Sequence, residues 1–106
     1  ANPQAVRRLM ELLTADGRYA EAEAVFSKLA DSSTASADVQ RLAAEASLRT
    51  GKQAEALKQA ALAVSDTSTN PADHLWVGRV FVAAGQREKA EASFRRAVEL
   101  RPDSAD

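Results

Sequence analysis

Hydrophobic residues recur along the chain at the spacing of amphipathic helices. Between positions 6 and 29, apolar side chains come every three or four residues in two groups, which Asp16-Gly17 separates. This spacing predicts two helices with one apolar face each, and the glycine can adopt the left-handed conformation in which many helices end. The first group comprises Val6, Leu9, Leu12 and Leu13, and the second comprises Ala22, Val25, Phe26 and Leu29.

The same pair of helical patterns is predicted twice more along the chain. One pair covers 37–50 and 53–65, and the other covers 71–84 and 87–100. Polar linkers at 31–36 and 66–70 separate the pairs.

Three glycines, each between the two helices of a pair, set the period of this pattern. Gly17, Gly51 and Gly85 lie 34 residues apart both times (51 − 17 and 85 − 51). A fixed interval of this size is typical of helical repeat proteins. We therefore predict an all-α array of about six helices over residues 1–106, with repeats at 3–36, 37–70 and 71–104.

The predicted helix starts repeat at the same interval. Asn2-Pro3 and Asn70-Pro71 each place an N-cap residue before proline at the first helical position, where a missing N–H costs nothing. Ser36 holds the cap position midway between them, and the triplet at 36–38 recurs at 104–106. The recurrence predicts that the chain is part of a longer array; the alternative is a chance polar tail.

Helical hairpins with this period resemble tetratricopeptide repeats. The resemblance covers nearly the whole chain and implies a right-handed superhelical α-solenoid. The family's tryptophan position holds Val6, Gln40 and His74 here, and the alanine-rich second repeat is expected to be thinly packed. The third repeat fits best, with Val77-Gly78, Phe81, Ala90, Phe94, Ala97 and Pro102 at pattern positions.

Composition and charge exclude several classes of partner. With 14 basic and 15 acidic residues the formal net charge is −1, so the chain has no net positive charge to attract nucleic acid or anionic lipid. No apolar run approaches the length of a membrane span. Cysteine is absent, so there is no disulfide frame. An alanine-rich composition is typical of bacterial proteins, but the sequence leaves the compartment open.

The sequence carries no pattern of catalytic or metal-binding residues. His74 is the only histidine, and no glycine-rich phosphate loop, HExxH motif or calcium loop occurs. We therefore predict no enzymatic activity, no catalytic residues, no metal site and no cofactor. His74 is expected at the surface or in a helix cap.

The resemblance implies that the first helices of successive repeats line a concave face that binds a protein or peptide segment. Arginines on that face suit an acidic or C-terminal segment, because a guanidinium can hold a carboxylate through two hydrogen bonds. The positions carried over are Arg7, Glu11, Arg41, Glu45, Leu48, Arg49, Leu75, Arg79 and Val82, with Gln4, Thr14, Asp38 and Ala83 beside them.

Other interpretations of this face stay open. Arg7–Glu11, Arg41–Glu45 and Glu45–Arg49 are i, i+4 pairs, which also stabilise a helix that only faces solvent. The clamp of chaperone-binding relatives is not expected, because Glu11 at one of its positions would repel a terminal carboxylate. Trp76 is either an anchor for a partner or, as we favour, a residue packed against the second repeat.

The C-terminal end of the array supports a second hypothesis. The face that a further repeat would cover is expected to carry Val80, Phe81, Phe94 and Val98. An uncovered apolar face favours self-association. The sequence thus predicts a non-enzymatic protein-binding scaffold. The alternatives are a spacer or self-association segment of a longer repeat protein, and, more remotely, a regulatory domain of an enzyme.

Overall fold

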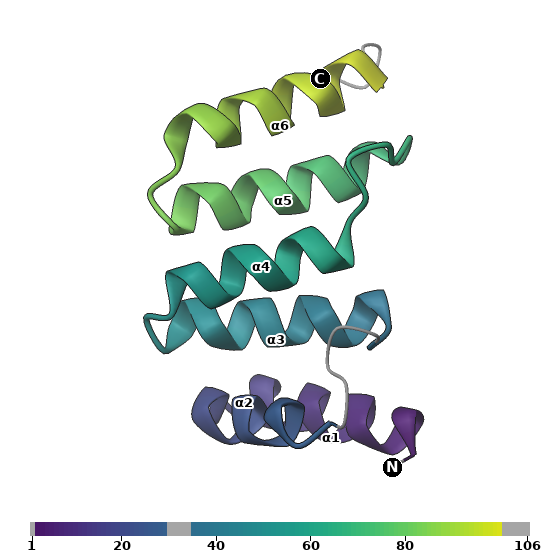
Figure 1. Ribbon diagram of the computed structural model, residues 1–106, viewed down its shortest axis with the longest axis vertical. Coiled ribbons are helices and arrows are strands. Elements are labelled where there is room, and N and C mark those ends of the chain that lie inside the picture. The colour runs from purple at the N-terminus through teal and green to yellow at the C-terminus, as the bar shows by residue number, and fades with distance from the viewer. Residues whose placement is uncertain (1, 30–34, 101–106) are drawn as a thin grey trace.

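The computed structural model describes residues 2–29 and 35–100, and in these the chain forms helices and no strands. The prediction of six helices and an all-α fold is confirmed (Figure 1). The helices are α1 (Pro3–Ala15), α2 (Tyr19–Ser27), α3 (Ala37–Arg49), α4 (Gln53–Ala63), α5 (Pro71–Ala83) and α6 (Arg87–Leu100).

The helix starts follow the period predicted from the glycines. The starts of α1, α3 and α5 are 34 residues apart, and so are the starts of α2, α4 and α6. The Asn2 side chain accepts a hydrogen bond from the Gln4 amide at 2.9 Å, and the Asn70 side chain accepts one from the Ala72 amide at 3.0 Å. Ser36 caps α3 through the Val39 amide. Each first helix therefore begins at a side-chain cap.

The three turn glycines end the first helix of each hairpin in the same way. Gly17, Gly51 and Gly85 have φ of 75°, 81° and 77°, in the left-handed region. The amide after each glycine donates to a carbonyl five residues back, at 2.8 Å in all three turns. This is the Schellman arrangement, which pairs carbonyls that the helix end would otherwise leave without a partner.

The hairpins follow one another along the long axis of a molecule of 41 × 25 × 24 Å. In Figure 1 the α1–α2 hairpin lies at one end, α6 lies at the other, and α3, α4 and α5 follow in chain order between them. The right-handed twist of the array stays a prediction. The triplet at 104–106 and Pro102 lie outside the described residues.

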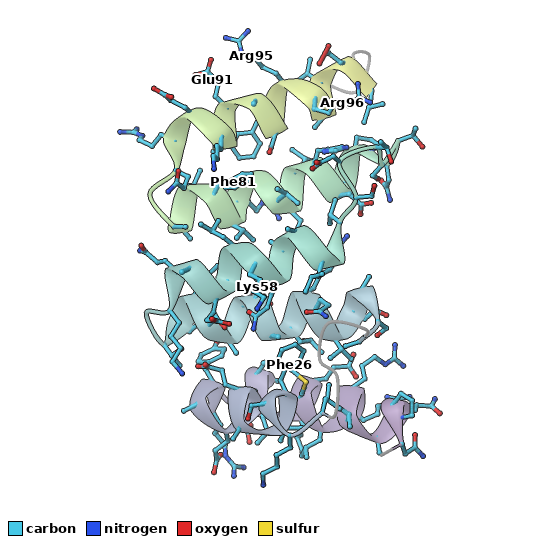
Figure 2. All side chains as sticks on the ribbon, viewed as in Figure 1. Phe26, Lys58, Phe81, Glu91, Arg95 and Arg96 are labelled. Carbon is cyan, nitrogen blue, oxygen red and sulfur yellow. The ribbon has the colours of Figure 1, made fainter. Side chains whose placement is uncertain are left out.

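The core runs between successive hairpins. Phe26 of α2 points toward α3 (Figure 2), where it packs with Val39 and Ala43 and with Met10 of α1. Ala22, Ala56 and Ala90 occupy the same position in the three second helices, and at most 2% of each is exposed. Small side chains at these positions let the two helices of each hairpin approach closely.

The second hairpin, which we expect to be thinly packed, buries small and polar side chains. Ala43, Ala44, Ala46 and Ala56 are fully buried. Between α3 and α4 the Ser47 hydroxyl donates to the Gln59 side-chain oxygen at 2.9 Å. Because a buried polar group needs a partner, this bond fixes the register of the two helices.

Candidate functional site

The first helices α1, α3 and α5 form one face of the molecule, here called the first-helix face. Two hollows lie along it, and Glu45 of α3 lines both. The first, of about 230 Å³, is lined by Glu11, Thr14, Ala15, Tyr19, Leu42 and Glu45. The second, of about 380 Å³, is lined by Glu45, Leu48, Arg49, Trp76, Arg79, Val80 and Ala83.

The second hollow combines apolar walls with positive charge. Leu48 comes from α3, whereas Trp76 and Val80 come from α5, so the hollow lies between the second and third hairpins. Arg79 has no acidic partner within 4.0 Å in the part of the chain that the structure describes. Apolar walls with a few charged groups are typical of sites that receive a ligand side chain.

Two of the predicted binding arginines are held by acidic residues of the next hairpin. Arg7 Nη1 lies 3.4 Å from Asp38 Oδ2, and Arg41 Nη2 lies 2.5 Å from Asp73 Oδ1. Both aspartates are in the first turn of the following first helix. Arg7 and Arg41 therefore join adjacent hairpins, and each guanidinium already has a carboxylate beside it. Their binding of a partner's carboxylate stays a prediction.

Arg41 also contacts Trp76. Its guanidinium carbon lies 4.8 Å from the centroid of the Trp76 ring, a cation–π geometry. Trp76 thus contacts the second repeat, as favoured from sequence, while it also lines the second hollow. The two interpretations of Trp76 are compatible.

The loop before α5 is attached to Asp73 and His74. The Ser68 hydroxyl donates to Asp73 Oδ2 at 2.7 Å, and His74 Nε2 lies 2.8 Å from the Ser68 carbonyl oxygen. The hydroxyl of Ser68 and then the guanidinium of Arg41 lower the pKa of Asp73, although burial opposes them. His74 was expected at the surface or in a helix cap; it is only 6% exposed, so a surface position is wrong, and its contact is with the backbone just before α5.

The remaining residues carried over for this face occupy varied surroundings. Glu11 and Glu45 line the hollows, and the guanidinium carbon of Arg49 lies 5.7 Å from the ring centroid of Tyr19. Leu75 is 41% exposed at the α5 position that Arg7 and Arg41 hold in the earlier first helices. Sequence reasoning missed Tyr19, because it starts a second helix and only first helices were carried over.

Val80 and Val82 lie the other way round from their assignment by sequence. Val80, expected on the C-terminal end of the array, is 3% exposed and lines the second hollow. Val82, expected on the binding face, is 54% exposed and lines a separate hollow with Phe94 and Val98. Residues two apart in a helix point about 200° apart, so these two valines face opposite neighbours.

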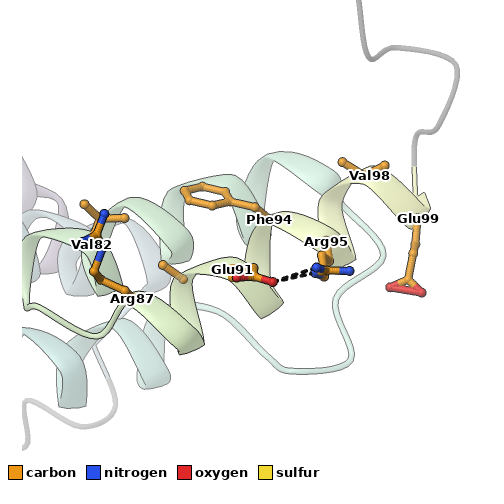
Figure 3. A pocket seen from close by; sticks show the side chains of 8 residues that line it. Val82, Arg87, Glu91, Phe94, Arg95, Val98 and Glu99 are labelled. Atoms are coloured by element: carbon orange, nitrogen blue, oxygen red, sulfur yellow. Dashed lines mark hydrogen bonds and ion pairs between the residues drawn. The ribbon is translucent and has the colours of Figure 1, made fainter.

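The separate hollow lies at the C-terminal end of the molecule and measures about 740 Å³ (Figure 3). Val82, Phe94 and Val98 form its apolar part, here called the C-terminal end face. The Arg95 guanidinium donates to Glu91 at its rim, with Nη2 at 2.7 Å from Oε1. Phe81 is half-buried and lines none of these hollows.

The described residues gather no group of three or more histidine, aspartate or glutamate side chains that could hold a metal ion. Over residues 2–29 and 35–100, no helix combines the length and the apolar character that crossing a membrane requires.

Residues 74–104 match the sequence model of the tetratricopeptide repeat family. The third hairpin is therefore similar to a tetratricopeptide repeat. The match runs from the first turn of α5 through the end of α6, and the caps, turns and helix starts of the other two hairpins share its 34-residue period. Tetratricopeptide repeats generally mediate contacts between proteins and generally act as non-catalytic scaffolds. A comparison with curated proteins found no match.

Proposed function

We propose that the first-helix face binds a segment of another protein, and that the second hollow is the centre of this contact. The observation that carries the proposal is the composition of that hollow. Leu48, Trp76 and Val80 give it apolar walls, and Arg49 and Arg79 lie beside them. Buried aromatic and arginine side chains are the residues that most often dominate protein interfaces.

The charges around the hollow favour a particular kind of segment. Arg7 and Arg41 pair with aspartates of the chain, so their charge is already balanced. Arg79 pairs with no acidic side chain among residues 2–29 and 35–100. The partner segment therefore places a large apolar side chain in the hollow and an aspartate, a glutamate or its own C-terminal carboxylate at Arg79.

This proposal names a more specific ligand than the acidic or C-terminal segment predicted from sequence. The sequence predicts a mixed surface with four arginines, and two of these pair with aspartates between hairpins. One hollow with a nearby arginine favours a short motif in the partner, in which an apolar residue lies next to an acidic one. Arg49 and Arg79 outnumber Glu45 there, so the local charge is positive.

Selection from a library of short random peptides displayed on phage tests the proposal. The native chain is expected to enrich peptides that carry an aromatic or large aliphatic residue next to an acidic one. Trp76→Ala is expected to weaken the enriched peptides by roughly thirtyfold, the effect of removing about 2 kcal/mol at an interface hot spot. Arg79→Glu is expected to abolish selection of the acidic residue.

Arg96→Glu on α6 is the matched control, because Arg96 is exposed and lines none of the hollows. It should leave the enriched motif unchanged. No enrichment over background, or enrichment that survives both Trp76→Ala and Arg79→Glu, contradicts the proposal. The chain is then better explained as a spacer without a ligand of its own.

A further inference from the structure

Positions one period apart in the three hairpins show which faces a neighbouring hairpin covers. Two positions of the first helices can be identified from α3, where they face the preceding hairpin. In α3 they hold Ala43 and Ala46, both 0% exposed. Ala43 packs with Met10 and Phe26, and Ala46 packs in a cluster with other residues of the first hairpin.

In α1 the same two positions hold larger, exposed side chains. Leu9 is 43% exposed and Leu12 is 60% exposed. They are here called the N-terminal end face. In α5 the position of Leu12 holds Val80, which is 3% exposed. The position of Leu12 is thus buried in the second and third hairpins, each of which follows a described hairpin.

The opposite end of the molecule shows the complementary pattern. Val64, the C-cap that follows α4, is 7% exposed, whereas Val98, one period later and inside α6, is 55% exposed. Phe26 is 8% exposed beneath α3. Phe94, two periods later, lines the open C-terminal end face with Val82 and Val98 (Figure 3). Phe26 and Val64 are thus both covered, and each has a described hairpin after it.

The C-terminal end face differs from the first junction in the size of its side chains. In the first hairpin, Phe26 packs with Met10 and meets the small Ala43. In the third hairpin the position of Met10 holds Gly78, and the ring of Phe94 lies against it. The ring is therefore drawn toward α5, and a hollow of about 740 Å³ opens beside it. Leucines fill such a hollow where alanines would leave it empty.

We infer that a second copy of the chain covers the C-terminal end face, head to tail. Leu9 and Leu12 of one copy enter the hollow formed by Val82, Phe94 and Val98 of the other. The contact repeats the geometry of the junctions inside the chain, so a second copy presents the helix face that this end accepts. A head-to-tail contact leaves a free face at each end, so copies add in an open series. This inference is independent of the first-helix face.

Sedimentation velocity over a range of concentrations tests the inference with two charge-introducing variants. The native chain is expected to form dimers and longer species as its concentration rises. Leu12→Glu loses the N-terminal end face, and Val98→Glu loses the C-terminal end face. Because both side chains are more than half exposed, the folded helix content should persist in circular dichroism. Each variant alone is expected to stay monomeric.

Mixing the two variants gives the decisive result. Leu12→Glu retains an intact C-terminal end face and Val98→Glu retains an intact N-terminal end face, so the mixture is expected to form a one-to-one dimer and nothing longer. Leu62→Glu is the control, because Leu62 is 46% exposed on α4, outside both end faces. It should associate like the native chain.

Three outcomes overturn the inference. A native chain that sediments as a monomer at every concentration would show that no copy covers either face. Dimers of Leu12→Glu alone would indicate a symmetric contact between two C-terminal ends. Loss of association in Leu62→Glu would indicate non-specific contact between exposed apolar residues.

Discussion

The ring of Phe94 lies so close to Gly78 that a methyl group on residue 78 would be 2.5 Å from Phe94 Cε1. Real Cβ atoms essentially never come that close to another atom, so the Phe94 ring or the helix would have to shift. Gly78 lies inside α5 and its φ is not positive, so backbone conformation does not require a glycine there. The close approach of Phe94 does. The contact also sets the shape of the C-terminal end face.

Gly78→Ala is expected to lower the free energy of unfolding by about 1–2 kcal/mol. Overpacking of this kind costs roughly 1–3 kcal/mol, and the better helix propensity of alanine returns up to about 1 kcal/mol. Urea denaturation measures the change. In a Phe94→Leu background the same substitution should cost less, because the smaller side chain can move away. A Gly78→Ala variant as stable as the native chain would show that Phe94 is free to shift.

The ion pair between Arg41 and Asp73 is expected to stabilise the junction of the second and third hairpins. Their side chains are 31% and 23% exposed, so the pair is only partly screened by solvent. Asp73→Asn should cost about 1 kcal/mol at neutral pH, including the weakened bond from Ser68. Asp38→Asn is the matched control, and it should cost less, because Asp38 is 67% exposed and lies 3.4 Å from Arg7.

The same aspartate makes stability depend on pH. Because the pKa of Asp73 is lowered in the folded chain, its contribution is present above the unfolded value of about 3.9 and is lost as the pH falls through the folded pKa. The difference in unfolding free energy between the native chain and Asp73→Asn should be constant near neutral pH and shrink in acid. A difference that does not change between neutral and acid pH would contradict this role for Asp73.

Gly51 is expected to be required by backbone conformation alone. Its φ is 81°, and nothing lies within 4 Å of a Cβ placed there. Gly51→Ala should therefore cost about 1–2 kcal/mol, the penalty of a left-handed conformation for a residue with a Cβ. Gly51→Asn should cost less, since asparagine tolerates this region. Thermal unfolding compares the two, and equal losses would indicate a steric rather than a conformational cause.

Much of the fold could be predicted from local sequence signals. The caps at Asn2, Ser36 and Asn70 and the turn glycines depend on a few adjacent residues, so the helix starts and ends were accessible. The period then predicted the hairpins, and the family match over residues 74–104 agrees with the repeat in which the pattern is clearest.

The candidate site was less predictable, because it depends on how hairpins meet. Arg41 could be placed on the first helices, but its pairing with Asp73, 32 residues later, depends on the spacing between hairpins. His74 was expected at the surface or in a helix cap, and its burial could not be predicted because its bond to the Ser68 carbonyl requires the folded loop. The faces predicted for Val80 and Val82 were the wrong way round. Helical spacing shows that the two residues lie on different faces, but it does not show which hairpin each face meets.

Binding at the second hollow can be observed directly through Trp76, the only tryptophan of the chain. A peptide with an aromatic residue next to an acidic one is titrated into the native chain while the tryptophan emission is recorded; the peptide itself carries no tryptophan. The account predicts a saturable change in emission that Arg79→Glu abolishes and Arg96→Glu preserves. A peptide that binds by calorimetry without changing the emission, or that binds Arg79→Glu equally well, would contradict it.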